Sequence, residues 1–127
     1  EGSPYGYEAP SLYCIDAETF TIEKRFKFKL GDWPSEVQLN GTGDKLYWLN
    51  DDVWEMSVDA SRLPAKPFLP YRNTLYYGLT IDPVSGEVYV ADAIDYQQNG
   101  MVYRYSKDGE LLDEFYVGII PGAFAWK

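Results

Sequence analysis

The chain has 127 residues, enough for one ordinary domain, and its 46% hydrophobic and 17% aromatic residues predict a sizeable core. Eleven basic and 20 acidic residues give a net charge of −9, which disfavours nucleic acid or an anionic membrane surface as a partner. There is no histidine and only one cysteine, so an internal disulfide is excluded and neither a histidine-based catalytic triad nor an imidazole metal site is expected.

Two short strands are the first predicted elements, at 12–15 and 22–28. The segment 12–15 resembles the later segment 53–56, which begins 41 residues further along the chain. This match predicts that the first two strands are the third and fourth strands of a repeating unit. Cys14 lies within the first apolar strand and is therefore predicted to be an inert thiol of the core.

A β-hairpin is predicted twice, at an offset of 42 residues. Its first strand is 37–40 in one copy and 79–82 in the other, and its second strand is 45–50 and 87–92. In each copy, four residues rich in Gly, Pro, Ser or Asp join the two strands, as is typical of hairpin turns.

A third and a fourth strand are predicted after each hairpin. The third strand is 53–56 in the first copy and 102–105 in the second, an offset of 49, so the second copy has seven extra residues before this strand. The fourth strand is predicted at 66–69 and at 112–117. The residues after 122 resemble the first strand of yet another unit.

A repeated four-stranded unit of about 40–45 residues is typical of a propeller blade. We therefore predict an all-β propeller fragment of about two and a half blades, the C-terminal part of a larger ring. Its parts are a partial blade at 11–29, a blade at 35–70, a blade at 76–117 and a closing strand at 123–127. Open sheet edges are expected to pair with the remaining blades or with another copy. A β-sandwich is the alternative, but it gives no reason for the fixed offsets.

The connecting loops are predicted to divide between two faces of the propeller. One face receives short turns, whereas the other receives longer loops rich in Tyr, Asn, Gln and Asp, which indicates a binding surface. The candidate ligand-binding residues on this second face are Tyr5, Tyr7, Trp33, Tyr77, Asp92, Asp95, Tyr96, Gln97 and Gln98.

Each candidate also has a structural alternative. Trp33 precedes a proline and could pack at a blade junction, and Asp92 could cap the turn that it starts. Asp92 and Asp95, together with Asp51 and Asp52, could form a calcium site, but the ordered spacing of an EF-hand is missing and no metal is predicted. No catalytic residue is predicted either, because nothing selects a pair of carboxylates for acid–base chemistry.

Five runs of the sequence carry a resemblance to a known family. They are Glu1-Gly2-Ser3-Pro4-Tyr5-Gly6-Tyr7, Gly31-Asp32-Trp33-Pro34, Tyr77-Gly78-Leu79, Tyr89-Val90-Ala91-Asp92-Ala93-Ile94-Asp95-Tyr96 and Gly118-Ile119-Ile120-Pro121-Gly122-Ala123-Phe124. They resemble the last third of a YncE-type, seven-bladed propeller family of gut Bacteroidetes. Members encoded beside outer-membrane corrinoid transporters are surface lipoproteins that capture cobalamin.

The resemblance implies a non-catalytic, lipid-anchored protein at the cell surface, which passes cobalamin to a TonB-dependent outer-membrane transporter and holds no covalent cofactor. From their positions in the loops, Tyr5, Asp95, Tyr96 and Gln97 are predicted to hydrogen-bond the ligand, and Trp33 and Tyr77 to stack on it. Two alternatives stay open: a propeller that binds a protein or a glycan at the same face, and a calcium-dependent hydrolase or lyase.

Overall fold

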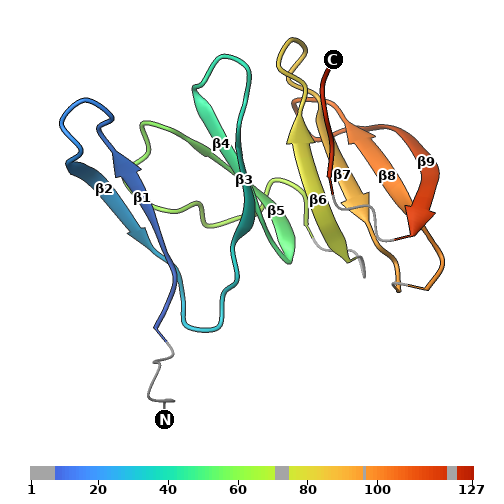
Figure 1. Cartoon of the computed structure of the whole chain (residues 1–127), viewed down its shortest axis with the longest axis horizontal. Coiled ribbons are helices and arrows are strands. Elements are labelled where there is room, and N and C mark those ends of the chain that lie inside the picture. Colours follow the sequence, from blue (N-terminus) through green and yellow to red (C-terminus); the bar gives the residue numbers. More distant parts are fainter. Residues whose placement is uncertain (1–7, 71–74, 96, 120–122) are drawn as a thin grey trace.

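The computed structural model describes residues 8–70, 75–95, 97–119 and 123–127, which form nine strands and no helix (Figure 1). No helix that could span a membrane is therefore found in these residues. The strands are β1 (Ser11–Ile15), β2 (Ile22–Lys27), β3 (Ser35–Leu39), β4 (Lys45–Asn50), β5 (Asp52–Ser57), β6 (Tyr76–Ile81), β7 (Val88–Asp92), β8 (Asn99–Tyr105) and β9 (Leu111–Ile119).

The strands form three antiparallel sheets that stand side by side like the blades of a fan (Figure 1). Their strand orders are β1-β2, β3-β4-β5 and β6-β7-β8-β9, so each strand pairs with its neighbour in sequence. Successive hairpins of this kind are what the sequence repeat predicts. The all-β propeller fold is therefore confirmed, with a complete four-stranded sheet only in the last repeat that the structure describes.

The second sheet differs from its prediction at the fourth strand. In place of a strand at 66–69, the structure has a single antiparallel bridge between Val53 and Leu69. Pro67 lies within this segment, and Pro64 and Pro70 flank it. Proline lacks the backbone N–H that a strand ladder needs, which explains why the pairing does not extend. The segment still packs against the second sheet, because the Leu69 side chain is buried in the core.

The largest apolar core lies between the second and third sheets. Its buried members are Tyr47, Leu49, Val53, Leu69, Leu79, Ile81, Val88, Val90 and Tyr105. The backbones also meet at one edge of this interface: a Cβ on Gly41 would lie 1.8 Å from the carbonyl oxygen of Pro83. Only glycine therefore lets the two hairpin turns approach so closely.

A second, smaller core joins the first sheet to the second. It buries Phe26, Phe28, Trp48 and Met56, with Trp54 packed against them. Lys24 of β2 reinforces the contact, because its Nζ donates to the carbonyl oxygens of Val58 (3.0 Å) and Ala60 (3.3 Å).

The closing strand predicted at 123–127 is not a strand in this structure. A strand needs a partner for its backbone ladder, and these residues pair with none of the described strands. The segment instead rests on the third sheet (dark red in Figure 1): the Trp126 ring meets Tyr89 edge to face, and its Nε1 donates to Thr80 Oγ1 at 2.7 Å. Thr80 and Tyr89 alternate along β6 and β7 with residues that face the core, so the segment lies on the face turned away from the second sheet.

Candidate functional site

The connections between strands lie at two opposite edges of the sheets (Figure 1). We call the edge with the turns 16–21, 40–44, 82–87 and 106–110 the upper rim. The opposite edge, with the described residues 29–34, 51, 75, 93–95 and 97–98, is the lower rim. This division agrees with the predicted sorting of short turns and longer loops.

Side chains within the upper-rim turns hold those turns in place. Asp16 Oδ1 accepts from the backbone N–H groups of Glu18 (2.8 Å) and Thr19 (3.0 Å), and Asp82 Oδ1 accepts in the same way from Val84 (2.8 Å) and Ser85 (3.2 Å). These backbone hydrogen bonds hold the pKa of both carboxyl groups below the ordinary value. The Asp16 and Asp82 side chains thus stabilise their own turns.

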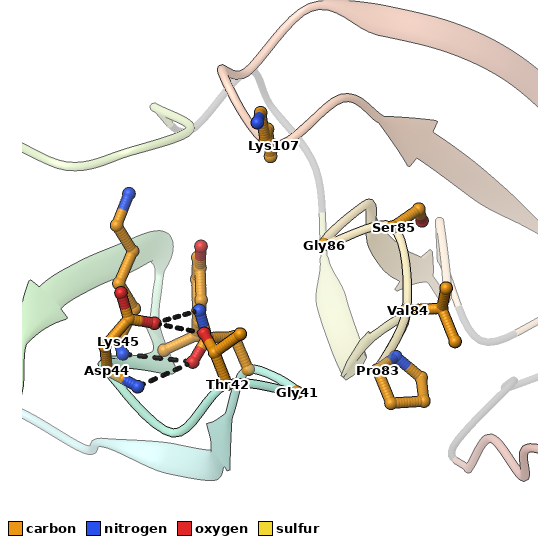
Figure 2. Close-up of a pocket in the computed structure, with 11 residues that line it drawn as sticks. Gly41, Thr42, Asp44, Lys45, Pro83, Val84, Ser85, Gly86 and Lys107 are labelled. Carbon is orange, nitrogen blue, oxygen red and sulfur yellow. Dashed lines mark hydrogen bonds between the residues drawn. The ribbon is translucent and has the colours of Figure 1, made fainter.

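A cleft of about 310 Å³ lies between two of these turns, beside the point where Gly41 meets Pro83, and Figure 2 shows the residues that line it. On one side, Asn40 Oδ1 accepts from the N–H groups of Asp44 and Lys45, each at 3.0 Å. The turn around Pro83 forms the other side, and Lys107 lies above the gap. The sequence predicts no site here, and the side chains of Asn40 and Asp44 already bond to each other at 2.7 Å.

On the lower rim, Asp92 anchors the long loop between β7 and β8. Its side chain is only 4% exposed, and its Oδ1 accepts from the N–H groups of Leu75 (2.9 Å) and Ile94 (2.8 Å). The N–H of Ala93 in turn donates to the Leu75 carbonyl at 3.0 Å. Asp92 therefore lies beneath the loop and positions it, which favours the turn-capping alternative over a direct ligand contact.

The loop beyond Asp92 is shaped by a second aspartate. Asp95 Oδ1 accepts from the N–H groups of Gln97 (3.0 Å) and Gln98 (3.1 Å), and its Oδ2 accepts from Gln98 Nε2 at 3.1 Å. The first of these bonds is the main reason that the Asp95 pKa is lowered. Ile94 adopts φ = 59°, which is unusual for a β-branched residue. Asp95, Gln97 and Gln98, all predicted contacts, are exposed and lie together.

Two predicted aromatic contacts lie elsewhere on this side of the molecule. The Trp33 side chain is 84% exposed, and its backbone N–H donates to Asn50 Oδ1 at 3.0 Å, which ties the connection between β2 and β3 to the second sheet. Tyr77 in β6 is 44% exposed. Trp33 is thus not a packing residue within the described structure. Tyr5, Tyr7 and Tyr96 lie outside the described residues.

A lower-rim cleft of about 440 Å³ was missed by the sequence reasoning. It opens between β2 of the first sheet and β4–β5 of the second, and Phe28, Trp48, Trp54 and Asn50 are among its lining residues. Trp48 and Trp54 lie within predicted strands, and no sequence motif joins them to β2, so the cleft depends on how two sheets meet.

Metal-binding chemistry finds little support in the described part of the chain. There, no three His, Cys, Asp or Glu side chains come close enough to hold an ion. Asp51, Asp52, Asp92 and Asp95 were the calcium ligands in the alternative considered from the sequence. Asp92 Oδ1 instead accepts hydrogen bonds from two backbone N–H groups.

Comparison with known proteins supports the fold only. No protein-family model matches the chain, and no curated protein matches it by sequence. A quinoprotein alcohol dehydrogenase-like protein from Bacteroides thetaiotaomicron superposes with a TM-score of 0.64 at 21% identity, over 79% of this chain and 27% of that one. A protein of unknown function from Bacteroides caccae gives a TM-score of 0.61 at 14% identity, over 84% of this chain and 36% of that one. The chain thus spans well under half of either neighbour, and these likenesses agree with its propeller fold.

Proposed function

We propose that this chain is part of a non-catalytic propeller that captures a corrinoid, cobalamin in the first place, at its lower rim. The observation that carries the proposal is the β7–β8 loop, which presents exposed Gln97 and Gln98 amides on a backbone fixed by Asp92 and Asp95. Backbone amides that are already hydrogen-bonded before binding, as those of Ile94, Gln97 and Gln98 are, leave less conformational entropy to lose when the ligand arrives.

The chemistry of a corrinoid suits such a surface. Its macrocycle is flat and apolar and is edged by amide groups, so it calls for aromatic faces together with side chains that both donate and accept hydrogen bonds. Trp33 and Tyr77 offer the exposed rings, and Gln97 and Gln98 offer the amides. The chain has no histidine, so capture would use the periphery of the corrinoid and not a histidine bond to cobalt.

The proposal extends to the setting of the protein. Following the family resemblance, we propose a lipid-anchored position at the cell surface and transfer of the corrinoid to a TonB-dependent transporter. The net charge of −9 gives the protein no attraction of its own to anionic lipid, so in this proposal the lipid anchor alone holds it at the surface.

Calorimetric titration of cyanocobalamin into the purified protein tests the proposal. We expect saturable binding, at least tenfold weaker in the double variant Gln97→Ala/Gln98→Ala. Val84 is 95% exposed on the upper rim, so Val84→Ala is the matched control and is expected to bind as the parent does. A folded protein that binds no cyanocobalamin would overturn the proposal. Binding of a glycan or a protein at the same rim would then be the function to test.

A further inference from the structure

The first sheet turns an apolar face away from the rest of the described structure. Tyr13 and Ile15 alternate along β1 on this face, and both are exposed. The sequence repeat aligns Ile15 with Met56 of the second sheet and Tyr105 of the third. Met56 is 6% exposed because it packs against the first sheet, and Tyr105 is buried against the second, whereas Ile15 is 56% exposed. Ile15 therefore holds a position that makes a contact between sheets in each later repeat.

The third sheet, at the other end of the fan, has an open face of the opposite kind (Figure 1). Phe115 of β9 pairs with Val102, as Leu69 pairs with Val53 in the second sheet. Leu69 is 4% exposed, because the third sheet covers it, whereas Phe115 is 44% exposed. This face of the third sheet thus lacks the cover that its equivalent in the second sheet has.

An apolar cavity of about 380 Å³ lies on this open face. Tyr89 and Phe115 line it from the sheet, and Phe124 and Trp126 line it from the C-terminal segment. Because 123–127 resembles the first strand of a repeat, the innermost position on this face is already filled. The cavity extends from that segment across β7, β8 and β9, so the place left open is the one that the outer strands of a following sheet would cover.

The charges of the two faces are complementary. On the first sheet, the guanidinium carbon of Arg25 lies 5.7 Å from the centroid of the Tyr13 ring, which puts a cation on the apolar face. On the open face of the third sheet, Asp113 lies opposite Arg104 in the β8–β9 register. Arg104 already forms an ion pair with Glu87 at 2.7 Å, so two carboxylates against one guanidinium leave an excess of negative charge. Opposite charges on two surfaces favour and orient their association.

We propose that the open face of the third sheet binds the outer face of the first sheet of a second copy of this chain. Tyr13 and Ile15 of the incoming copy enter the cavity beside Phe115, and the C-terminal segment stays in place. The two faces suit each other, because 123–127 supplies the position of a first strand and the incoming β1 and β2 supply a third and a fourth. Since the faces differ, the contact is head-to-tail and builds a ring or an open chain of copies.

Sedimentation velocity over a wide range of protein concentration tests the proposal. We expect the parent to associate, and its association to weaken at least about tenfold in Ile15→Asp and in Phe115→Asp, since each puts a carboxylate into an apolar contact. Both side chains are exposed in the single chain, so both variants are expected to fold, and circular dichroism melts check this. If one does not fold, the milder Tyr13→Ser or Phe115→Ser replaces it. Val84→Asp, on the exposed upper rim, is the matched control and is expected to associate as the parent does.

Mixing the two variants tests the head-to-tail arrangement. Ile15→Asp keeps its third-sheet face and Phe115→Asp keeps its first-sheet face, so the mixture should form a dimer of one copy of each and grow no further. A parent that stays monomeric at every concentration would overturn the proposal, and a further propeller repeat would then be the occupant to test. A mixture that stays monomeric although the parent associates would also overturn it, because the contact would then join like faces.

Discussion

The two rims of this propeller fragment connect strands by different means. On the upper rim, Asp16 and Asp82 each fold their own short turn by accepting neighbouring backbone amides. On the lower rim, Asp51 alone joins β4 to β5, whereas residues 93–98 join β7 to β8 at the equivalent place in the next repeat. The longer connection is accommodated because Asp92, at the end of β7, bonds both to that loop and to Leu75. A repeat can therefore gain a surface loop without losing the register of its sheet.

The largest effect is expected when this lower-rim anchor is removed. Asp92→Ala leaves the Leu75 and Ile94 amides without an acceptor at a buried position, so we expect the free energy of unfolding to fall by about 3 kcal/mol. Urea denaturation measures the change. Asp92→Asn keeps an acceptor oxygen and is expected to cost roughly 1 kcal/mol. Equal stability of Asp92→Ala and the parent would show that the loop does not need its anchor.

A somewhat smaller loss is expected at the upper rim from Gly41→Ala. The new methyl group would meet the Pro83 carbonyl oxygen, and the two turns would have to separate, at a cost of about 2 kcal/mol. Gly118→Ala is the matched control, because nothing lies within 4 Å of its added Cβ. Thermal melts of both variants test this difference, and an unchanged Gly41→Ala variant would mean that the turns can move apart freely.

Trp33→Ala separates binding from stability on the lower rim. Its side chain is 84% exposed, so the free energy of unfolding is expected to change by less than about 0.5 kcal/mol. If the ring stacks on the ligand, the affinity for cyanocobalamin falls at least about tenfold. Calorimetry and urea denaturation of the same sample give both numbers. A loss of stability with unchanged affinity would show that Trp33 packs at the blade junction, which is the alternative that its position before Pro34 allows.

The smallest effect concerns acid stability and should be similar at the two rims. Backbone hydrogen bonds lower the pKa of Asp82 and of Asp95 in the folded chain, whereas the unfolded chain has a pKa of about 3.9. Each carboxylate thus contributes stability above that pH, and the contribution is lost as the pH falls through the lower, folded pKa. We expect Asp82→Asn and Asp95→Asn each to flatten the fall in melting temperature between about pH 5 and pH 2. Profiles identical to the parent's would contradict this assignment.

The sequence predicted the fold well, because hairpins and turns are local. The 42-residue offset placed β3–β4 and β6–β7 correctly, since each pairs neighbouring segments. The prediction of strand pairing failed where pairing depends on more than the alternation of apolar and polar residues. The three prolines around Phe68 reduce the fourth strand of the second sheet to one bridge, and residues 123–127 find no strand to pair with.

The site was less accessible to sequence reasoning. The polar β7–β8 loop was predicted from its extra residues, because an insertion in a repeat can be recognised from the sequence alone. Asp92 was ambiguous until its burial and its two amide donors were known. The cleft beside Trp48 could not be predicted, because residues of two different sheets form it and no sequence motif joins them.

Hydrogen–deuterium exchange with and without cyanocobalamin tests the central claim, that the lower rim is the binding face, most directly. The account predicts slower exchange in the ligand-bound state at 29–34 and 93–98, and unchanged exchange in the upper-rim turns at 40–44 and 82–87. Protection confined to the upper rim would contradict the account and move the site to the cleft of Figure 2.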